Sequence, residues 1–296
     1  MKNRAINKFL SDVLFFKQAF VLLMVLGITS CGSIITKAKI EFSQDLSATI
    51  LEFDDPETIK KGVPAYLILV SSMIKGDPDN PDLLETGARL YGAYASGFTD
   101  SDDSRKALAN RAFNYASQAM CIRNTNFCDV KSISYFEYEK RLNAVEPSQV
   151  QSLFIFVSSW AGVIEANSSD WNAIAELPKV KAGIQRVLAI DETLDNGNVH
   201  LYMAVMESLL PPTLGGKPEL AKEHFDRAIE ISHGENQMAK VIYAERYARM
   251  MFDRELHDQL LQEVLDAGPG PQDQILVNTL AKQKAAVLLN NADDYF

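Results

Sequence analysis

The feature that most constrains the fold of this chain is a recurring pattern of apolar residues with the period of an α-helix. Strand-like alternation of apolar and polar residues is scarce along the 296 residues. Helix-breaking residues interrupt the periodic stretches at short intervals, for example Gly62, Pro64 and the turn over residues 77–81. The composition is 47% hydrophobic and 23% charged, which is typical of a globular protein. The sequence therefore predicts an all-α body of helices joined by short turns.

Capping residues and breakers give the expected helix boundaries. Asp54 and Asp55 precede Pro56, the order that is typical of a helix N-terminus, and Gly62 with Pro64 is expected to end this first helix. The other expected helices cover residues 65–75, 82–98, 103–121, 136–143, 146–165, 178–194, 199–210, 218–232, 238–252, 254–265 and 273–290.

One arrangement of side chains recurs along the helical part of the chain. In Ala221-x-x-x-Phe225-x-x-Ala228 the spacing places a small, an aromatic and a small residue on one helix face. The same triad occurs at Ala109, Phe113 and Ala116, and a weaker version at Ala182 and Ala189 has Arg186 in the aromatic position. A small residue lets a neighbouring helix approach and the aromatic ring fills the gap between the two helices. Taken singly, each triad is also compatible with a generic helical core.

These triads resemble the tetratricopeptide repeat, in which helix hairpins pack small positions against large ones and stack into a curved array. The stretch between Tyr91 and Ala109, and the stretch that holds Pro211 to Gly216, are longer than a regular repeat allows. The resemblance implies paired antiparallel helices stacked as degenerate repeats, in a solenoid or a bundle.

The N-terminus has the layout of a secretion signal. Four basic residues precede an apolar run over residues 19–27, which falls short of the ~20 residues that a bilayer-spanning helix needs. The sequence Ile28-Thr29-Ser30-Cys31-Gly32 then resembles the bacterial lipobox, whose cysteine is acylated before cleavage. We expect residues 1–30 to be a cleaved signal peptide, 31–53 a tether and linker, and 54–296 the helical domain. The alternative is ordinary secretion with an unmodified Cys31.

Lipidation of Cys31 would anchor the protein to a membrane without inserting it, because two or three acyl chains bind a bilayer stably. Gly32 follows the cysteine where an Asp would retain the protein at the inner membrane in enteric bacteria, so the outer membrane is favoured. We therefore expect a periplasmic, lipid-anchored protein.

The charge balance argues against nucleic acid as a partner. Removing residues 1–30 takes four basic residues and one acidic residue from the 29 and 39 of the whole chain, which leaves a net charge of −13. No cluster of Lys and Arg stands out that would neutralise phosphates.

The remaining cysteines, Cys121 and Cys128, flank an Asn-rich break after an expected helix. In an oxidising compartment a disulfide across this loop is the favoured interpretation. Two separate half-buried thiols are the alternative, and a zinc site is disfavoured because no His or second Cys pair lies nearby at ligand spacing.

A more specific resemblance comes from the segment Leu209-Leu210-Pro211-Pro212-Thr213-Leu214-Gly215-Gly216-Lys217-Pro218-Glu219 and the helix after it. Further support lies in Tyr243-Ala244-Glu245-Arg246-Tyr247-Ala248, in Asp253-Arg254-Glu255-Leu256 and in the last residues of the chain. These segments resemble the T component of tripartite ATP-independent periplasmic (TRAP) transporter systems, the TatT family. The resemblance extends from about Gly62 to the C-terminus.

The resemblance implies a periplasmic lipoprotein of cryptic tetratricopeptide repeats that assembles as a homotrimer around a pore. It also implies docking of a TRAP-type solute-binding protein, whose cargo is a small, hydrophobic organic acid. The rival function is a generic envelope scaffold of the same repeat type without a small ligand. A helical-bundle hydrolase with an unrecognised site is a distant third.

Two groups of residues are predicted to contact the ligand or the partner protein. Pro211, Pro212, Leu214, Gly215 and Gly216 form a loop that is rigid at one end and permissive at the other, which suits either a pore-edge contact or a plain inter-helix corner. Cations and aromatic side chains suited to an organic anion are Arg246, Tyr247, Arg249 and Tyr202. The alternative for the arginines is a solvated or ion-paired helix face.

No pattern of catalytic residues stands out. His200, His224, His233 and His257 show no metal-binding pair at helical spacing, and neither a Gly-rich phosphate loop nor a G-x-S-x-G elbow occurs. The Asp-Asp pairs lie in turns or in the tail, where carboxylates cap helices. We therefore expect no enzymatic activity, no cofactor and no metal.

Overall fold

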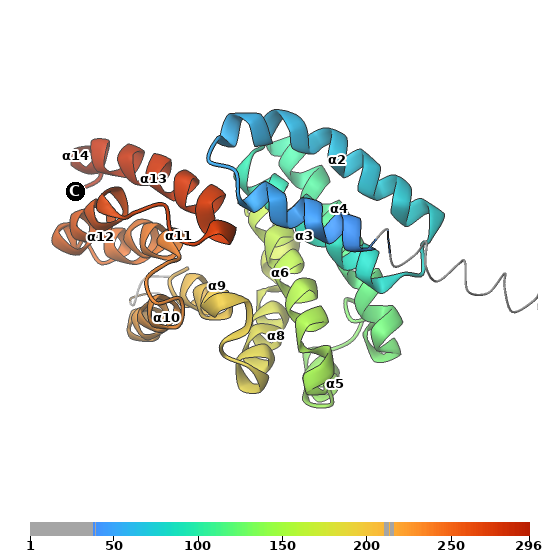
Figure 1. Cartoon of the computed structure of the whole chain (residues 1–296). Coiled ribbons are helices and arrows are strands. Elements are labelled where there is room, and N and C mark those ends of the chain that lie inside the picture. The colour runs from blue at the N-terminus through green and yellow to red at the C-terminus, as the bar shows by residue number, and fades with distance from the viewer. Residues whose placement is uncertain (1–37, 39, 210–212, 214–215) are drawn as a thin grey trace, which may run out of the picture. The chain divides into compact units, whose positions relative to one another are not determined.

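The structure of the chain is a computed structural model that describes residues 38, 40–209, 213 and 216–296 (Figure 1). All regular structure in these residues is helical, and they contain no strand, so the all-α prediction is confirmed. The predicted signal peptide, Cys31, and four predicted loop residues, Pro211, Pro212, Leu214 and Gly215, lie outside the described residues. The chain divides into two compact units, residues 1–45 and 46–296, and the helices named below belong to the second.

The longer helices lie close to the expected ranges, except that α2 covers the first two expected helices without a break and α11 ends earlier than expected. They are α2 (Pro56–Gly76), α3 (Pro81–Gly97), α4 (Asp102–Arg123), α5 (Tyr135–Asn143), α6 (Val150–Ala166), α8 (Leu177–Ile190), α9 (Asn198–Glu207), α10 (Pro218–Ile231), α11 (Gln237–Ile242), α12 (Arg254–Asp266) and α13 (Ile275–Asn290). Short elements were not expected: the helices α7 (Trp171–Ile174) and α14 (Ala292–Tyr295), and the 3-10 turns η1 (Thr125–Phe127), η2 (Pro147–Gln149), η3 (Leu194–Gly197) and η6 (Gln272–Gln274). A π-helix, η5 (Tyr243–Ala248), continues α11. Residues 40–51, in the stretch expected as linker, are helical.

The capping residues explain where these helices start. Side-chain oxygens of Asp55, Asn80, Ser101 and Asp253 accept hydrogen bonds from backbone N–H groups in the first turns of α2, α3, α4 and α12. These donors have no partner inside a helix, so a polar N-cap stabilises each start by about 1 kcal/mol.

The break expected at Gly62 and Pro64 does not occur, because α2 runs through both residues. Pro64 has no N–H to give to the carbonyl of Lys60 one turn earlier. The Tyr94 hydroxyl of α3 donates to that carbonyl instead, at 3.0 Å. Ile59 and Val63 are buried on the same side of α2, so packing against the rest of the unit also holds this helix together.

Helices that follow one another along the chain pack against one another. α3 packs on α2 and α4, α4 on α6, α6 on α8, α8 on α9, and α9 on α10 (Figure 1). In the C-terminal part α11 and α12 both pack on α13. This succession of neighbouring helices agrees with stacked helix pairs; the assignment to tetratricopeptide-like repeats stays a prediction.

The apolar side chains form two main cores. The first contains an aromatic cluster in which Phe113, Phe156 and Trp160 lie with ring centroids 5.5–5.6 Å apart. The second surrounds Phe225, whose ring stacks on Tyr243 at 4.6 Å. Both complete small-aromatic-small triads are buried. Five of their six residues belong to these two cores, and Ala116 belongs to a smaller cluster with Ala88 and Ile155. At the weaker triad, Arg186 donates to the carbonyl of Val145 at 2.7 Å and so ties down a loop rather than filling a core.

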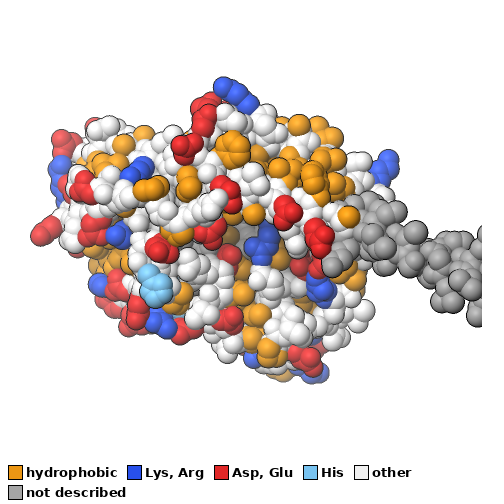
Figure 2. All heavy atoms as spheres, in the orientation of Figure 1, with side chains coloured by type: hydrophobic (Ala, Val, Ile, Leu, Met, Phe, Trp, Pro, Cys, Tyr) orange, Lys and Arg blue, Asp and Glu red, His pale blue; other side chains and the backbone are white. Residues whose placement is uncertain are grey.

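The surface of the unit is mixed in charge. Figure 2 shows acidic and basic side chains interspersed on one face, with apolar side chains gathered over α2, where Ile68 is 72% exposed. Among the described residues, no helix combines the length and the hydropathy that a bilayer crossing requires.

Candidate functional site

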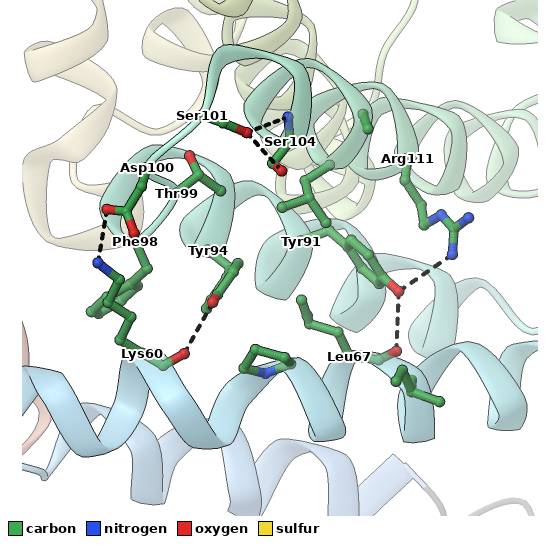
Figure 3. Close-up of a pocket in the computed structure, with 14 residues that line it drawn as sticks. Lys60, Leu67, Tyr91, Tyr94, Phe98, Thr99, Asp100, Ser101, Ser104 and Arg111 are labelled. Atoms are coloured by element: carbon green, nitrogen blue, oxygen red, sulfur yellow. Dashed lines mark hydrogen bonds and ion pairs between the residues drawn. The ribbon is translucent and has the colours of Figure 1, made fainter.

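A groove of about 600 Å³ lies over α3, between α2 and α4 (Figure 3). Its floor is made by Tyr91, Tyr94 and Phe98, which follow one another at helical spacing along α3 and its C-cap. The rings of Tyr94 and Phe98 stack with centroids 5.7 Å apart. Pro64 and Leu67 of α2, with Leu108 of α4, complete the apolar part of the wall. The volume falls within the range of roughly 300–1,000 Å³ that small-molecule sites occupy.

Hydrogen bonds to α2 fix the two tyrosines of the floor. The Tyr91 hydroxyl donates to the carbonyl of Leu67 at 3.2 Å and lies 2.8 Å from the Ser71 hydroxyl. The Tyr94 hydroxyl donates to the carbonyl of Lys60, the acceptor that Pro64 leaves without a helix partner. Both phenol groups are therefore engaged with α2, and the rings are held as a rigid surface.

Two cations lie at opposite ends of the groove (Figure 3). The Lys60 ammonium pairs with Asp100 at 2.8 Å, and this hydrogen bond raises the pKa of Lys60. The Arg111 guanidinium lies over the Tyr91 ring, 5.5 Å from its centroid, and 3.5 Å from the Tyr91 hydroxyl, which raises the pKa of Arg111. Within the described parts of the chain, no carboxylate lies at ion-pairing distance from Arg111. The groove therefore has one neutralised end and one positive end.

Tyr202 and Arg246, two of the residues predicted to contact a ligand, lie on α9 and η5. Tyr202 of α9 packs edge-on against Phe154, with ring centroids 5.6 Å apart. Burial and then the negative charges of Asp195 and Glu165 raise its pKa to about 12. Arg246 of η5 is half-exposed and lies 3.7 Å from Glu165. The charge of Glu165 on α6 thus acts on Tyr202, and its carboxylate lies close to Arg246.

Of the other two predicted contact residues, Tyr247 lies in the C-terminal core, whereas Arg249 is partly buried and lies against the exposed Tyr295. Tyr247 is 8% exposed and packs edge-on against Tyr243, with centroids 5.3 Å apart. Arg249 lies over the ring of Tyr295, 4.8 Å from its centroid. Of the predicted loop, Gly216 is described and precedes α10.

The backbone beside Tyr202 carries local strain. Asp195 and Asn196 adopt left-handed conformations with φ of 55° and 56°, and Gly197 follows with φ of 82°. Asp and Asn tolerate this region better than other residues with a side chain, at a cost of about 1–2 kcal/mol each. The Asp195 carboxylate lies 3.9 Å from Arg89 of α3, which joins this turn to the N-terminal helices.

The structure brings together two histidines that the sequence analysis treated separately. His200 of α9 and His224 of α10 face each other with their Nδ1 atoms 2.8 Å apart. The other ring nitrogen of His200 lies 3.2 Å from Glu192, which also pairs with Arg227 and has its pKa lowered to about 2. His200 and His224 are 24 residues apart in the sequence, and this spacing is not a recognisable motif. The pair forms because α9 packs on α10.

A metal site is not formed by these side chains. Among the residues described, no group of three or more His, Cys, Asp or Glu side chains is arranged to hold a metal ion.

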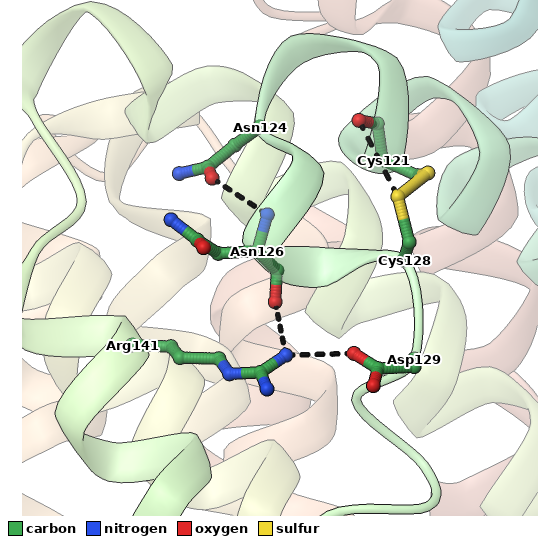
Figure 4. Close-up of a disulfide and its surroundings, with 6 residues drawn as sticks. All are labelled: Cys121, Asn124, Asn126, Cys128, Asp129 and Arg141. Atoms are coloured by element: carbon green, nitrogen blue, oxygen red, sulfur yellow. Dashed lines mark hydrogen bonds and ion pairs between the residues drawn. A yellow bond between two sulfur atoms is a disulfide. The ribbon is translucent and has the colours of Figure 1, made fainter.

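A disulfide joins Cys121 and Cys128, whose Cα atoms are 4.5 Å apart (Figure 4). The loop that it closes is also held by Arg141, whose guanidinium donates to the carbonyl of Asn126 at 2.6 Å and to Asp129 at 2.7 Å. This loop is therefore tied to α5 as well as to the end of α4.

Comparison with known proteins identifies the family. No curated protein matches the sequence at a significant level. The model of the family described as TRAP transporter T-component matches residues 52–296, which include the groove, the Tyr202 region and the C-terminal core. Because this match covers most of the chain, the protein belongs to the TRAP transporter T-component family.

Proposed function

We propose that this chain is a lipid-anchored accessory component that docks a TRAP-type solute-binding protein and assists uptake of a small, hydrophobic organic acid. The observation that carries the proposal is the family match over residues 52–296. Membership makes the chain an accessory component of a TRAP transport system. The partner protein, the mode of docking and the acid are the proposed parts.

Anchoring through Cys31 is proposed on the lipobox-like sequence around that residue. The n-region and the short apolar run before it support export, and Gly32 favours the outer membrane over the inner membrane. In this arrangement the helical domain stands in the periplasm, where a soluble solute-binding protein reaches it.

Assembly as a homotrimer around a pore is proposed on the family resemblance. The stacked helices leave exposed apolar side chains, among them Ile68 and Val287, that support contacts between subunits. A catalytic role is not proposed, because the family is one of transporter components.

Docking is proposed to use the loop of Pro211, Pro212, Leu214, Gly215 and Gly216, together with Arg246 and Tyr202. Arg246 supports this role because its ion pairs, at 3.7 Å with Glu165 and 3.9 Å with Glu245, are long and leave its donors accessible. Tyr247 is proposed to support this helix from its inner side, because it packs in the C-terminal core. Arg249 is proposed to support it through its contact with the Tyr295 ring.

The test is crosslinking in cells that produce the full chain with a C-terminal affinity tag, followed by identification of the captured proteins by mass spectrometry. A TRAP-type solute-binding protein is the expected major partner, and Arg246→Glu is expected to reduce its yield about tenfold. Arg254→Glu is the matched control, because Arg254 is equally exposed but is paired with Asp258 and Asp293 on α12 and the tail. Capture of envelope-assembly proteins without any solute-binding protein would favour the generic scaffold instead.

A further inference from the structure

Most arginines that the structure describes already have close partners. Those that donate to a carboxylate or a backbone carbonyl within 3.3 Å are Arg105, Arg123, Arg141, Arg186, Arg227 and Arg254. Arg89, Arg111, Arg246 and Arg249 make no such contact, and of these four Arg111 lines the groove. Its one hydrogen bond among the described residues is the long 3.5 Å contact with the Tyr91 hydroxyl. A guanidinium has five N–H donors in a planar fork, so most of the donors of Arg111 face the groove or solvent.

We propose that the groove over α3 binds an anion with a flat, apolar body, whose anionic group pairs with Arg111 and whose body lies on Tyr94 and Phe98. The inference deepens the proposed function, because it gives the organic acid a site on this chain. It rests on the geometry of the groove and not on the docking of any partner protein.

The charge of the groove favours an anion. Lys60 is neutralised by Asp100 at 2.8 Å, which leaves Arg111 as the uncompensated charge at the other end. The chain as a whole has a net charge of −10, so a positive groove stands out against an acidic surface. Arginine also matches the two oxygens of a carboxylate with two parallel N–H donors.

The floor and walls favour an apolar body over a sugar-like one. Three aromatic rings and the side chains of Pro64 and Leu108 offer ring faces and methylene groups to a ligand. The hydroxyl groups at the edge are already used within the protein. Thr99 donates to the carbonyl of Ala95 at 2.7 Å, and the Ser101 hydroxyl accepts from the backbone N–H of Ser104 at 3.2 Å. A ligand rich in hydroxyls would therefore find few free partners.

Hydrogen bonds between α2 and α3 make the floor of the groove rigid. Pro64 frees the carbonyl of Lys60, and the Tyr94 hydroxyl takes that acceptor, so α2 and α3 are joined at the edge of the floor. The Tyr91 hydroxyl joins the same two helices at the Arg111 end. A floor held at both ends loses little freedom when a ligand binds, which favours affinity.

The experiment uses the full chain purified in detergent and follows 4-fluorophenylacetate by ¹⁹F NMR, with protein-free detergent as the blank. The uncharged 4-fluorophenylacetamide is the comparison probe. We expect saturable binding of the acid and about tenfold weaker binding of the amide. The reason is that a hydrogen bond to a charged group contributes about a factor of ten in affinity. Arg111→Met is expected to weaken binding of the acid about tenfold and to leave the amide unchanged, whereas Phe98→Ala weakens both.

Arg105→Met is the matched control on the same helix, because Arg105 pairs with Asp102 at 2.8 Å and does not line the groove. Equal affinities for acid and amide, an unchanged affinity of Arg111→Met for the acid, or no saturable binding would each overturn the inference. The two proposals can be overturned separately. If the chain captures a solute-binding protein but binds no probe, only the proposed ligand site in the groove is ruled out. If the chain binds the probe but captures no such protein, only the proposed docking role is ruled out.

Discussion

His200 and His224 are two titratable side chains in direct hydrogen-bond contact. Their Nδ1 atoms are 2.8 Å apart, so one ring donates the hydrogen bond and the other accepts it. The acceptor must be a neutral imidazole, because an imidazolium has no free nitrogen lone pair. The pair therefore holds α9 against α10 only while at least one of the rings is unprotonated.

The surroundings of the two rings favour their neutral forms. Burial is the largest effect on both rings, and it lowers the pKa of His200 and of His224. The carboxylate of Glu192 acts in the opposite direction on His200, while Arg227 adds to the lowering. Glu207 and Glu223 favour the charged form of His224, and Lys181 and His200 oppose it.

This pair makes stability depend on pH. Because the folded state lowers both pKa values below the ordinary value near 6.5, the unfolded chain takes up protons first as the pH falls. The free energy of unfolding is therefore expected to decrease between about pH 7.5 and pH 5.5. His224→Gln removes one of the two groups and is expected to reduce this decrease roughly by half, as measured by urea unfolding at the two pH values.

His233→Asn is the control for this measurement. His233 is exposed and has a φ of 50°, a conformation that Asn tolerates, and it makes no contact with the pair. Its replacement should leave the pH dependence of the parent unchanged. A His224→Gln protein whose stability changes with pH as much as that of the parent would show that the pair does not control this dependence.

At the scale of elements, the contact of α8 with α6 depends on a glycine. A Cβ added at Gly183 would lie 2.4 Å from Val157 Cγ1 and 3.1 Å from the Tyr138 hydroxyl. Val157 is fully buried and its branched side chain has little freedom, so the two helices would have to separate.

The expected effect of Gly183→Ala is a loss of about 2 kcal/mol in the free energy of unfolding. Gly162→Ala is the matched control, because Gly162 lies in α6 and a Cβ there would meet nothing within 4 Å. The free energy of unfolding of Gly162→Ala is expected to equal that of the parent or to exceed it by up to about 1 kcal/mol, because Ala has a higher helix propensity than Gly. Urea unfolding measures the free energy of unfolding of both variants. Equal values for Gly183→Ala and Gly162→Ala would contradict the close packing of α8 on α6.

Most helix boundaries could be predicted because their signals are local. Asp55 before Pro56 marks a helix start that the structure places at that residue, and the start expected at Arg254 is also observed. The break expected at Pro64 was wrong because the compensating hydroxyl belongs to Tyr94, 30 residues away in the sequence and on another helix. The π-helix over Tyr243–Ala248 was missed for a related reason: a change in hydrogen-bond pattern leaves the apolar periodicity almost unaltered.

The groove could not be predicted from the sequence, since its parts come from three helices. Lys60, Tyr94 and Arg111 carry no common motif, and their meeting depends on α2 and α4 both packing on α3. The aromatic spacing along α3 was the one local signal, and it is equally typical of a core face. Tyr202 and Arg246 were chosen by residue type, and the effect of the Glu165 charge on both side chains appears only in the folded chain.

The proposed trimer can be tested through the mass of the whole molecule in solution. The full chain purified in detergent is expected to have a protein mass three times that of the processed chain in size-exclusion chromatography with light scattering, after correction for bound detergent. A single mass three times that of one chain over a tenfold range of concentration would support a closed assembly. A monomer throughout that range would rule out a pore built from three subunits.

This helical protein is proposed to serve a TRAP system by binding its solute-binding protein. Isothermal titration of the purified full chain with a TRAP-type solute-binding protein encoded by the same genome, in matched detergent buffer, measures this binding. We expect saturable binding at one solute-binding protein per chain, weakened about tenfold by Arg246→Glu and unchanged by Arg254→Glu. No saturable binding to any such protein, with the chain folded and its helix content intact, would rule out this role.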